Sequence, residues 1–309
     1  MYKDHQAPEQ PICSVIIPAY NEEAVIVETL TALTKDMRAG EFDIIVVCNG
    51  CQDTTAAKAA ATCPQATVII QTEASKTKAL NTGLENAAVA PYVFLDADII
   101  TTAQAVRALV HRLEWSEALM AVGHAKFITD QSNFLVRAFY KAWLQNPYFD
   151  RHKMGGFFAV NAAGIKALGT FPETINDDEY VRRSLYHSCT FAGAALYEIK
   201  APRTLSSLIK VRARVYRGNR LLDQAGSAVK DDSKPVDIAF DKSVKKKNAL
   251  TFLHRLIRQP VLWFGAGIFA FTAVMAHMRN FLNGQPAWEK DMTNRAGSVS
   301  ITSTEGNGS

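Results

Sequence analysis

Two carboxylates one residue apart follow a short apolar run in the first third of the chain. The run is Tyr-Val-Phe-Leu at 92–95, and Asp96 and Asp98 come directly after it. A continuous apolar run opened by Pro91 is typical of a central strand buried on both faces. Burying a carboxylate costs free energy unless it is paired or binds a metal ion. The pattern therefore favours a divalent cation, Mg²⁺ or Mn²⁺, held by carboxylate oxygens and shared with the phosphates of a nucleotide. The alternative is a strand end where both aspartates are solvated beside the next helix.

The elements that must position this pair alternate between strand and helix. Apolar runs predict strands at 12–18, 42–48, 67–71 and 92–95, and helical periodicity predicts helices at 24–37, 55–61, 76–88 and 103–115. Such alternation is typical of right-handed βαβ units, and hence of an α/β fold with a doubly wound, mostly parallel sheet flanked by helices. Ligands of these sheets bind outside the carboxyl ends of the strands. We therefore expect Pro18–Glu22, Asn49–Asp53 and the two aspartates to face one crevice.

The pattern after residue 115 is mixed. It predicts strands at 120–127, directly after Gly155-Gly156, and at 191–199, with helices at 134–144 and 180–186. The adjacent glycines let the backbone pass close to a ligand, or they form an ordinary turn. The acids Asp177–Glu179 open a helix, where negative charge suits the helix dipole, so capping is an alternative to chemistry there.

A basic run follows at Lys210–Arg220, with five basic residues in eleven. Such a run is usually a solvated face. Here it comes after a site of the phosphate-binding type, and arginine forks make two-pronged contacts with phosphate oxygens. The second interpretation is therefore that this segment closes over a pyrophosphate.

The composition is that of a globular protein. The chain has 309 residues, 48% hydrophobic and 21% charged, and its formal net charge is +4. Residues 1–10 are polar and the first apolar run is too short for a signal peptide, so we expect a cytoplasmic protein. The five cysteines are odd in number and predict reduced thiols. Cys48 and Cys51 have the spacing of a redox pair or half a zinc site, which stay as alternatives.

A basic segment precedes a long uncharged one near the end of the chain. Lysines and arginines crowd residues 242–258, and Pro260–Ala276 has no charge over seventeen residues, near the lower limit for crossing a bilayer. The pattern predicts a helix that spans or lies on a membrane, with the heavier positive flank keeping the rest of the protein on the cytoplasmic face. It favours an anionic membrane surface over nucleic acid as the partner. The alternative is an apolar helix packed on the globular domain.

The order of these motifs resembles the family 2 inverting glycosyltransferases with the GT-A fold. The likeness runs from about Cys13 to Arg220. The family's P-A-(Y/H)-N-E motif corresponds to Pro18-Ala19-Tyr20-Asn21-Glu22, and its D-(D/N)-(G/C)-S-x-D-x-T motif to Cys48-Asn49-Gly50-Cys51-Gln52-Asp53-Thr54-Thr55. Its G-K-x-x-A-L-N-x-G motif corresponds to Lys76 with Ala79-Leu80-Asn81-Thr82-Gly83. Its D-x-D motif corresponds to Asp96-Ala97-Asp98, and its E-D motif to Asp177-Asp178.

The resemblance implies transfer of one sugar from a nucleoside diphosphate sugar, with a divalent metal. It implies that Asp178, beside Asp177, is the general base and that Asp98 with Asp96 holds the metal. Gly155 and Gly156 would line the sugar and acceptor site. The implied donor-binding residues are Pro18, Ala19, Tyr20, Asn21, Glu22, Asn49, Lys76, Asn81, Asp96, Arg214 and Arg217.

The chain departs from the family pattern at three places. Asn49 replaces the acid that contacts the base, and Ser75 replaces the glycine before Lys76. The Q-x-x-R-W motif of processive synthases aligns with residues 211–215, where only Arg214 is kept, so we expect single-sugar transfer. The expected acceptor is a lipid-linked or saccharide molecule near the membrane. Alternatives are a nucleotidyltransferase, and a sugar-nucleotide-binding scaffold without catalysis.

The expected domains follow from these assignments. They are an N-terminal arm at 1–11, a GT-A domain at 12–223, a polar basic linker at 224–250, a hydrophobic membrane-associating or transmembrane helix at 251–283 and a disordered tail at 284–309.

Overall fold

The computed structural model describes residues 10–151, 154–173, 176–228 and 242–282. Its centre is a mixed sheet that, in these residues, has eight strands in the order β3-β2-β1-β4-β7-β6-β8-β5. The strands are β1 (Cys13–Ala19), β2 (Phe42–Asn49), β3 (Thr67–Gln71), β4 (Tyr92–Leu95), β5 (Ile99–Thr101), β6 (Met120–Ile128), β7 (Phe157–Val160) and β8 (Cys189–Lys200).

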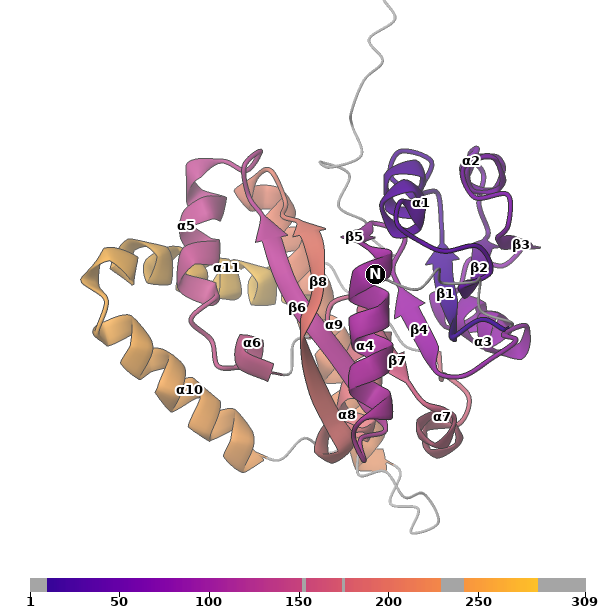
Figure 1. Cartoon of the computed structure of the whole chain (residues 1–309). Helices are drawn as coiled ribbons and strands as arrows, with labels where there is room; N and C mark the ends of the chain where they lie inside the picture. Colours follow the sequence, from indigo (N-terminus) through magenta and orange to yellow (C-terminus); the bar gives the residue numbers. More distant parts are fainter. Residues whose placement is uncertain (1–9, 152–153, 174–175, 229–241, 283–309) are drawn as a thin grey trace, which may run out of the picture.

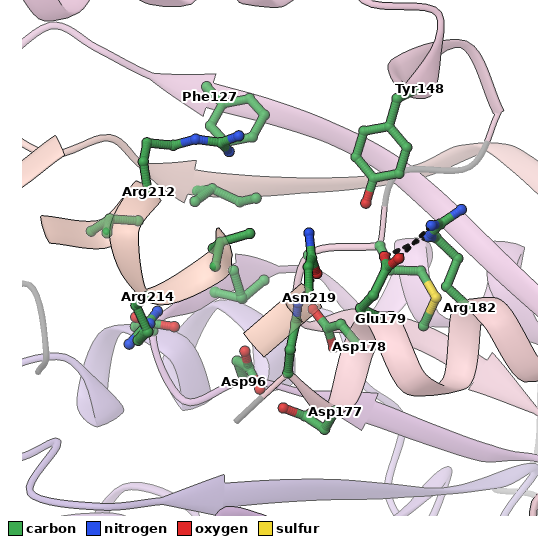
Figure 2. A pocket seen from close by; sticks show the side chains of 18 of the residues that line it. Asp96, Phe127, Tyr148, Asp177, Asp178, Glu179, Arg182, Arg212, Arg214 and Asn219 are labelled. Atoms are coloured by element: carbon green, nitrogen blue, oxygen red, sulfur yellow. Dashed lines mark hydrogen bonds and ion pairs between the residues drawn. The ribbon is translucent and has the colours of Figure 1, made fainter. Parts of the chain in front are cut away.

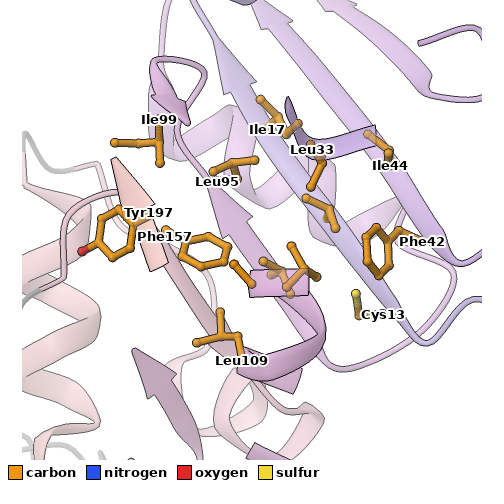
Figure 3. Packing of buried hydrophobic residues seen from close by; sticks show 14 of the residues in the cluster. Cys13, Ile17, Leu33, Phe42, Ile44, Leu95, Ile99, Leu109, Phe157 and Tyr197 are labelled. Carbon is orange, nitrogen blue, oxygen red and sulfur yellow. The ribbon is translucent and has the colours of Figure 1, made fainter. Parts of the chain in front are cut away.

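One half of the sheet is parallel, as the alternation predicts. Strands β3, β2, β1 and β4 all pair in parallel. The helices that link them are α1 (Ile26–Thr34), α2 (Thr55–Thr62) and α3 (Lys76–Glu85). Strand β1 is buried on both faces, because Val15 and Ile17 pack under α1 while Ile16 packs under α3. Figure 3 shows the first of these two cores, in which Leu33 of α1 lies over the strands.

The other half is built by longer connections. Strand β7 is antiparallel to both β4 and β6, β6 is parallel to β8, and β5 is antiparallel to β8. The helices of this half are α4 (Ala103–Glu114), α5 (Phe134–Trp143), α6 (Tyr148–Arg151), α7 (Ala162–Leu168) and α8 (Asp177–Ser184), with a short 3₁₀ turn at Tyr186–Ser188 before β8. The sheet is thus parallel in most of its described pairs but not throughout.

Two helix layers cover the sheet. Helices α1 and α4 pack on one face, and α3, α7 and α8 pack on the other. Both cores are continuous clusters of buried apolar residues. The two helix layers leave the carboxyl ends of β1, β2 and β4 uncovered along one edge of the sheet (Figure 1).

The last helices form a separate layer beside β6 and β8. Helix α9 (Leu205–Ala228) is followed by α10 (Lys242–Ile257), a 3₁₀ turn at Pro260–Leu262 and α11 (Trp263–Leu282) (Figure 1). Helices α9 and α10 occupy residues 224–228 and 242–250, so the linker predicted at 224–250 is helical there; the rest of it lies outside the described residues. The predicted tail at 284–309 and most of the arm at 1–11 also lie outside them.

Helix α11 is the one described helix long and apolar enough to cross a membrane by length and composition. It also packs on the globular domain along its length. Gly265 lies against the backbone of Ala138 in α5, and the Asn280 side chain donates to the Ala213 carbonyl oxygen of α9 at 2.8 Å. Both predicted features are therefore present: the apolar helix, and its contact with the domain.

Candidate active site

A cavity of about 1000 Å³ lies at the uncovered ends of β1, β2 and β4. Its lining has two chemically different parts. The first part is polar and acidic and comes mainly from the strand ends and α8. The second part is aromatic and comes from β6, α5, α9 and the α10–α11 pair, and we call it the aromatic half; its rings are Phe127, Tyr140, Trp143, Phe252 and Phe269.

Lys76 joins two of the carboxylates in the acidic part. Its Nζ lies 2.7 Å from Oδ1 of Asp96 and 3.0 Å from Oδ2 of Asp177. Burial alone would lower the pKa of Lys76, but the negative charges of Asp177, Asp96 and Asp178 outweigh burial and hold this pKa well above its ordinary value. Lys76 is therefore a fixed positive charge that ties the end of β4 to the start of α8.

Gly156 connects the same two elements through its backbone. Its N–H donates to Oδ2 of Asp178 at 2.9 Å, and its carbonyl oxygen accepts from the N–H of Asp96 at 2.8 Å. Gly156 has φ +78°, and a Cβ there would lie 2.5 Å from Oδ2 of Asp96. A glycine is needed for both reasons. The result is that Asp178 and Asp96 are held by the N–H and the carbonyl oxygen of the same residue.

An ion-pair network fixes the first turn of α8. Glu179 pairs with Arg182 at 2.6 Å and with Arg183 at 2.8 Å, and Arg183 also reaches Asp223 of α9. Figure 2 shows the Glu179–Arg182 pair on the far side of the helix from Asp177. Burial would raise the pKa of Glu179, but hydrogen bonds and charge from Arg182 and Arg183 lower it overall. This network anchors the helix turn that presents Asp178 to the cavity.

The strand-end loops of β1 and β2 form the far end of the acidic part. The Asn49 side chain is buried and donates to the Ala19 carbonyl oxygen at 2.9 Å. Asn21 has φ +50°, its N–H lies 3.4 Å from Sγ of Cys51, and its side-chain oxygen accepts from the Gln52 N–H. These contacts lock the two loops together, so this end of the cavity is preformed.

Cys48 and Cys51 are free thiols in this region. A hydrogen bond with the buried Cys48 lowers the pKa of Cys51, and so do the N–H of Asn21 and the hydroxyl of Thr55. Cys51 is half-buried. Among the described residues no group of three or more His, Cys, Asp or Glu side chains is arranged to hold a metal ion.

The chain matches the model of "Glycosyl transferase family 2" over residues 14–168. It belongs to this family. It is therefore a glycosyltransferase, as the motif order predicts. The comparison with curated proteins gives no match.

Solved structures show that this family 2 glycosyltransferase has the GT-A fold. One is a mannosyltransferase from Pyrobaculum calidifontis in complex with GDP-Man and Mn²⁺, with a TM-score of 0.56, 20% identity and coverage of 89% of this chain and 88% of that one. Another is glucosyl-3-phosphoglycerate synthase from Mycobacterium tuberculosis in complex with Mn²⁺, UDP and glucosyl-3-phosphoglycerate, with a TM-score of 0.51, 18% identity and coverage of 74% and 88%.

Most residues that the sequence assigned to the site of this glycosyltransferase do line the cavity. The lining includes Pro18, Tyr20, Glu22, Asn49, Lys76, Asp96, Asp98, Gly155, Asp177, Asp178 and Arg214. Strand ends and a helix start, distant in sequence, thus meet in one place.

Five of the assigned residues lie outside the lining: Ala19, Asn21, Asn81, Gly156 and Arg217. The role predicted for Asn81 stays a prediction; its side chain forms two hydrogen bonds with the backbone of Phe171 and so braces α3. The role predicted for Arg217 also stays a prediction; its side chain is buried on α9. Ala19, Asn21 and Gly156 contribute backbone and loop contacts instead.

Sequence reasoning missed the aromatic half and Arg212. The guanidinium of Arg212 lies 4.8 Å from the ring centroids of both Trp143 and Tyr216. The basic run at 210–220 marked this arginine, but the aromatic partner Trp143 is about seventy residues away in the chain. Only the packing of α5 against α9 brings them together.

The carboxylates present suit a divalent ion that a diphosphate helps to hold. Asp98 is exposed at the cavity, while one oxygen of Asp96 is engaged by Lys76. Mg²⁺ typically takes one or two protein carboxylates and completes its shell with phosphate oxygens and water. The donor set fits that arrangement and does not form a complete protein cage.

Proposed function

We propose that the protein transfers one sugar from a nucleoside diphosphate sugar to an acceptor hydroxyl with inversion at the anomeric carbon, and that Asp178 is the general base. The observation that supports this most directly is the placement of Asp178. Its carboxylate accepts the Gly156 N–H in the same cavity as Asp96 and Asp98. A hydrogen bond to the charged form of a carboxylate favours that form, and a base must be ionised to accept a proton.

Transfer on this arrangement begins with the donor at the strand ends. Asn49 and Tyr20 lie where the nucleoside would bind, and Arg214 lies on the α9 side of the same cavity. The acceptor hydroxyl approaches the anomeric carbon from the side of α8. Asp178 takes the hydroxyl proton as the new C–O bond forms and the bond to the diphosphate breaks, so the configuration inverts.

The departing diphosphate gains negative charge, which the site must stabilise. Asp98, with Asp96, would hold a divalent ion, and such an ion neutralises charge on a leaving phosphate. Lys76 already holds a positive charge between Asp96 and Asp177. Lys76 therefore keeps these two carboxylates compatible with an anionic donor, because it offsets their repulsion of the phosphates.

For the acceptor we propose a lipid-linked molecule at the cytoplasmic face of a membrane. The aromatic half of the cavity supports an apolar part in the acceptor. Helices α10 and α11, which help to line it, also expose large apolar side chains to the outside, such as Leu253, Val274 and Phe281. Exposed apolar surface beside a basic segment is typical of proteins that bind membrane surfaces.

The first experiment measures thermal stability with a panel of nucleoside diphosphates, with and without Mn²⁺. A ligand that binds the folded state raises the melting temperature by mass action. We expect a Mn²⁺-dependent rise with one base that Asp98→Ala removes. Asp36→Ala is the matched control, because Asp36 is exposed and does not line the cavity. No rise with any nucleotide would refute the proposed donor site.

A product assay then tests the reaction class. A glycosyltransferase releases a nucleoside diphosphate from the sugar donor. Release of pyrophosphate from a nucleoside triphosphate and a sugar phosphate would instead identify a nucleotidyltransferase, and the proposed role of Asp178 would be wrong.

A further inference from the structure

Arg212 has an unusual environment for a partly buried arginine. It lies on α9, and its guanidinium carbon lies over the rings of Trp143 and Tyr216, 4.8 Å from each ring centroid. One of its terminal nitrogens donates to the Tyr216 hydroxyl at 3.2 Å. The side chain lines the same cavity as Asp178. The two rings fix the position of the charge without neutralising it.

Within the described residues, no carboxylate forms an ion pair with Arg212, and its buried Nε has no hydrogen-bond partner. Four other arginines differ in this respect. Arg107, Arg182, Arg183 and Arg255 each pair with a carboxylate at 2.6–2.7 Å. Removing a charge from water without a counter-ion is costly, and contact with aromatic faces recovers only part of that cost. Arg212 is therefore arranged as a receptor for an anion from outside the protein.

The surroundings of Arg212 are apolar on the side away from the acidic residues. Phe127 packs on Trp143 with ring centroids 5.5 Å apart, and Phe252 packs on Phe269 at 5.4 Å. All four rings are half-buried and line the cavity. Apolar surface that lines a cavity beside a positive charge suits an anion that is attached to a hydrocarbon chain.

The position along the cavity separates this anion from the donor diphosphate. In Figure 2, Asp96, Asp177 and Asp178 lie together at one end, and Arg212 is at the other end. The donor site is at the strand ends, beside Asp98. An anion at Arg212 therefore belongs to the acceptor.

We propose that Arg212 binds the phosphate of an acceptor in which a hydrocarbon chain is joined through that phosphate to the group that receives the sugar. The chain lies among Phe127, Trp143, Phe252 and Phe269. The receiving hydroxyl then points from the phosphate toward Asp178. The assignment of this ligand as the acceptor rests on the proposed function, whereas the binding site itself rests on the geometry of Arg212.

The test measures binding by calorimetry, without any sugar transfer. The probes are farnesyl phosphate, which has chain and anion, farnesol, which has the chain alone, and inorganic phosphate. We expect farnesyl phosphate to bind more tightly than either of the others. Arg212→Met, which keeps the apolar stem, should weaken its binding about 10–100-fold, the range for loss of a charged hydrogen bond. Arg212→Lys should recover part of the loss.

Arg220→Met is the matched control, because Arg220 is exposed on the same helix and does not line the cavity. It should bind farnesyl phosphate as the unchanged protein does. Thermal unfolding of Arg212→Met reports whether that variant is folded, and a variant without a cooperative unfolding transition is replaced by Arg212→Gln. A saturating nucleoside diphosphate should leave farnesyl phosphate binding in place.

Three results would overturn the proposal. The first is that Arg212→Met binds farnesyl phosphate as tightly as the unchanged protein does. The second is that farnesol binds as tightly as farnesyl phosphate. The third is that the nucleoside diphosphate displaces farnesyl phosphate, which would place farnesyl phosphate in the donor site. Failure of the proposed function is a different result: no nucleotide would stabilise the protein, while farnesyl phosphate would still bind through Arg212.

Discussion

The parallel half of the sheet and the half beyond β4 are built in different ways. In the parallel half, β1, β2 and β3 are each followed directly by a helix, and Asn49, Asp96 and Asp98 lie at or just after the ends of β2 and β4. In the other half, β7 lies between β4 and β6, and helices α9, α10 and α11 meet α5 although it is far from them in the sequence. The strand-end residues of the cavity are therefore encoded locally, whereas the aromatic half exists only after the chain has folded.

The largest expected effect comes from separating binding from chemistry. Asp178→Asn keeps the shape of the side chain but removes the base. We expect sugar transfer to fall about 10²–10⁴-fold, the usual contribution of a general base, while nucleotide-dependent stabilisation stays unchanged. Asp36→Asn is the control, because Asp36 is exposed and does not line the cavity. Transfer at the normal rate by Asp178→Asn would show that the second half does not supply the base.

A second variant tests Gly156, whose backbone connects Asp96 in the first half with Asp178 in the second. Gly156→Ala places a Cβ 2.5 Å from Asp96 in a backbone with φ +78°. Gly169→Ala has a similar φ, +66°, with nothing within 4 Å of its Cβ. Both should lose roughly 1–3 kcal/mol of stability from the unfavourable φ. Only Gly156→Ala should also lower transfer, by about 10²-fold, because it displaces Asp96 and Asp178. Equal transfer by the two variants would contradict this.

A further set of three variants compares exposed apolar side chains in the two halves. Phe271 and Val274 of α11 are 49% and 57% exposed, and Ile70 of β3 is 72% exposed. If α11 contacts a membrane, Phe271→Gln and Val274→Gln should each weaken co-sedimentation with anionic vesicles about tenfold, given the free energy of burying such a side chain. Ile70→Gln should have no effect. Equal loss from all three variants would remove the assignment of the surface to α11.

The smallest expected effect is a difference in stability that is present at neutral pH and is lost at acid pH. The pKa of Glu179 is lowered from 4.5 in the folded protein, so its ionised form stabilises the fold above that pH, and this contribution is lost as pH falls through the folded pKa. Thermal unfolding should therefore show that Glu179→Gln is less stable than the unchanged protein at pH 7, and that the gap narrows below pH 4.5. A constant gap at all pH values would mean that the charge of Glu179 is not the stabilising feature.

The sequence predicted the parallel half almost completely. Continuous apolar runs located β1 to β4, and Asp96 and Asp98 were placed correctly at a strand end because strand polarity alone determines that position. The spacing of Asn81 from Lys76 does not reveal that its side chain bonds to the backbone of Phe171. The first part of α10, at 242–250, was predicted as linker because its residues are mostly polar and the partners of α10 on α5 and α11 are not local.

Gly265 has a consequence for how α11 meets its surroundings. A Cβ at this position would lie 2.3 Å from the carbonyl oxygen of Ala138, so the two helix backbones touch where a methyl group is absent. Farther along, His277 stacks on Tyr216 at 4.8 Å, which adds a second fixed point. A helix fixed at two points cannot rotate about its long axis. The fold therefore determines which side chains of α11 face outward, and it does so before any partner binds.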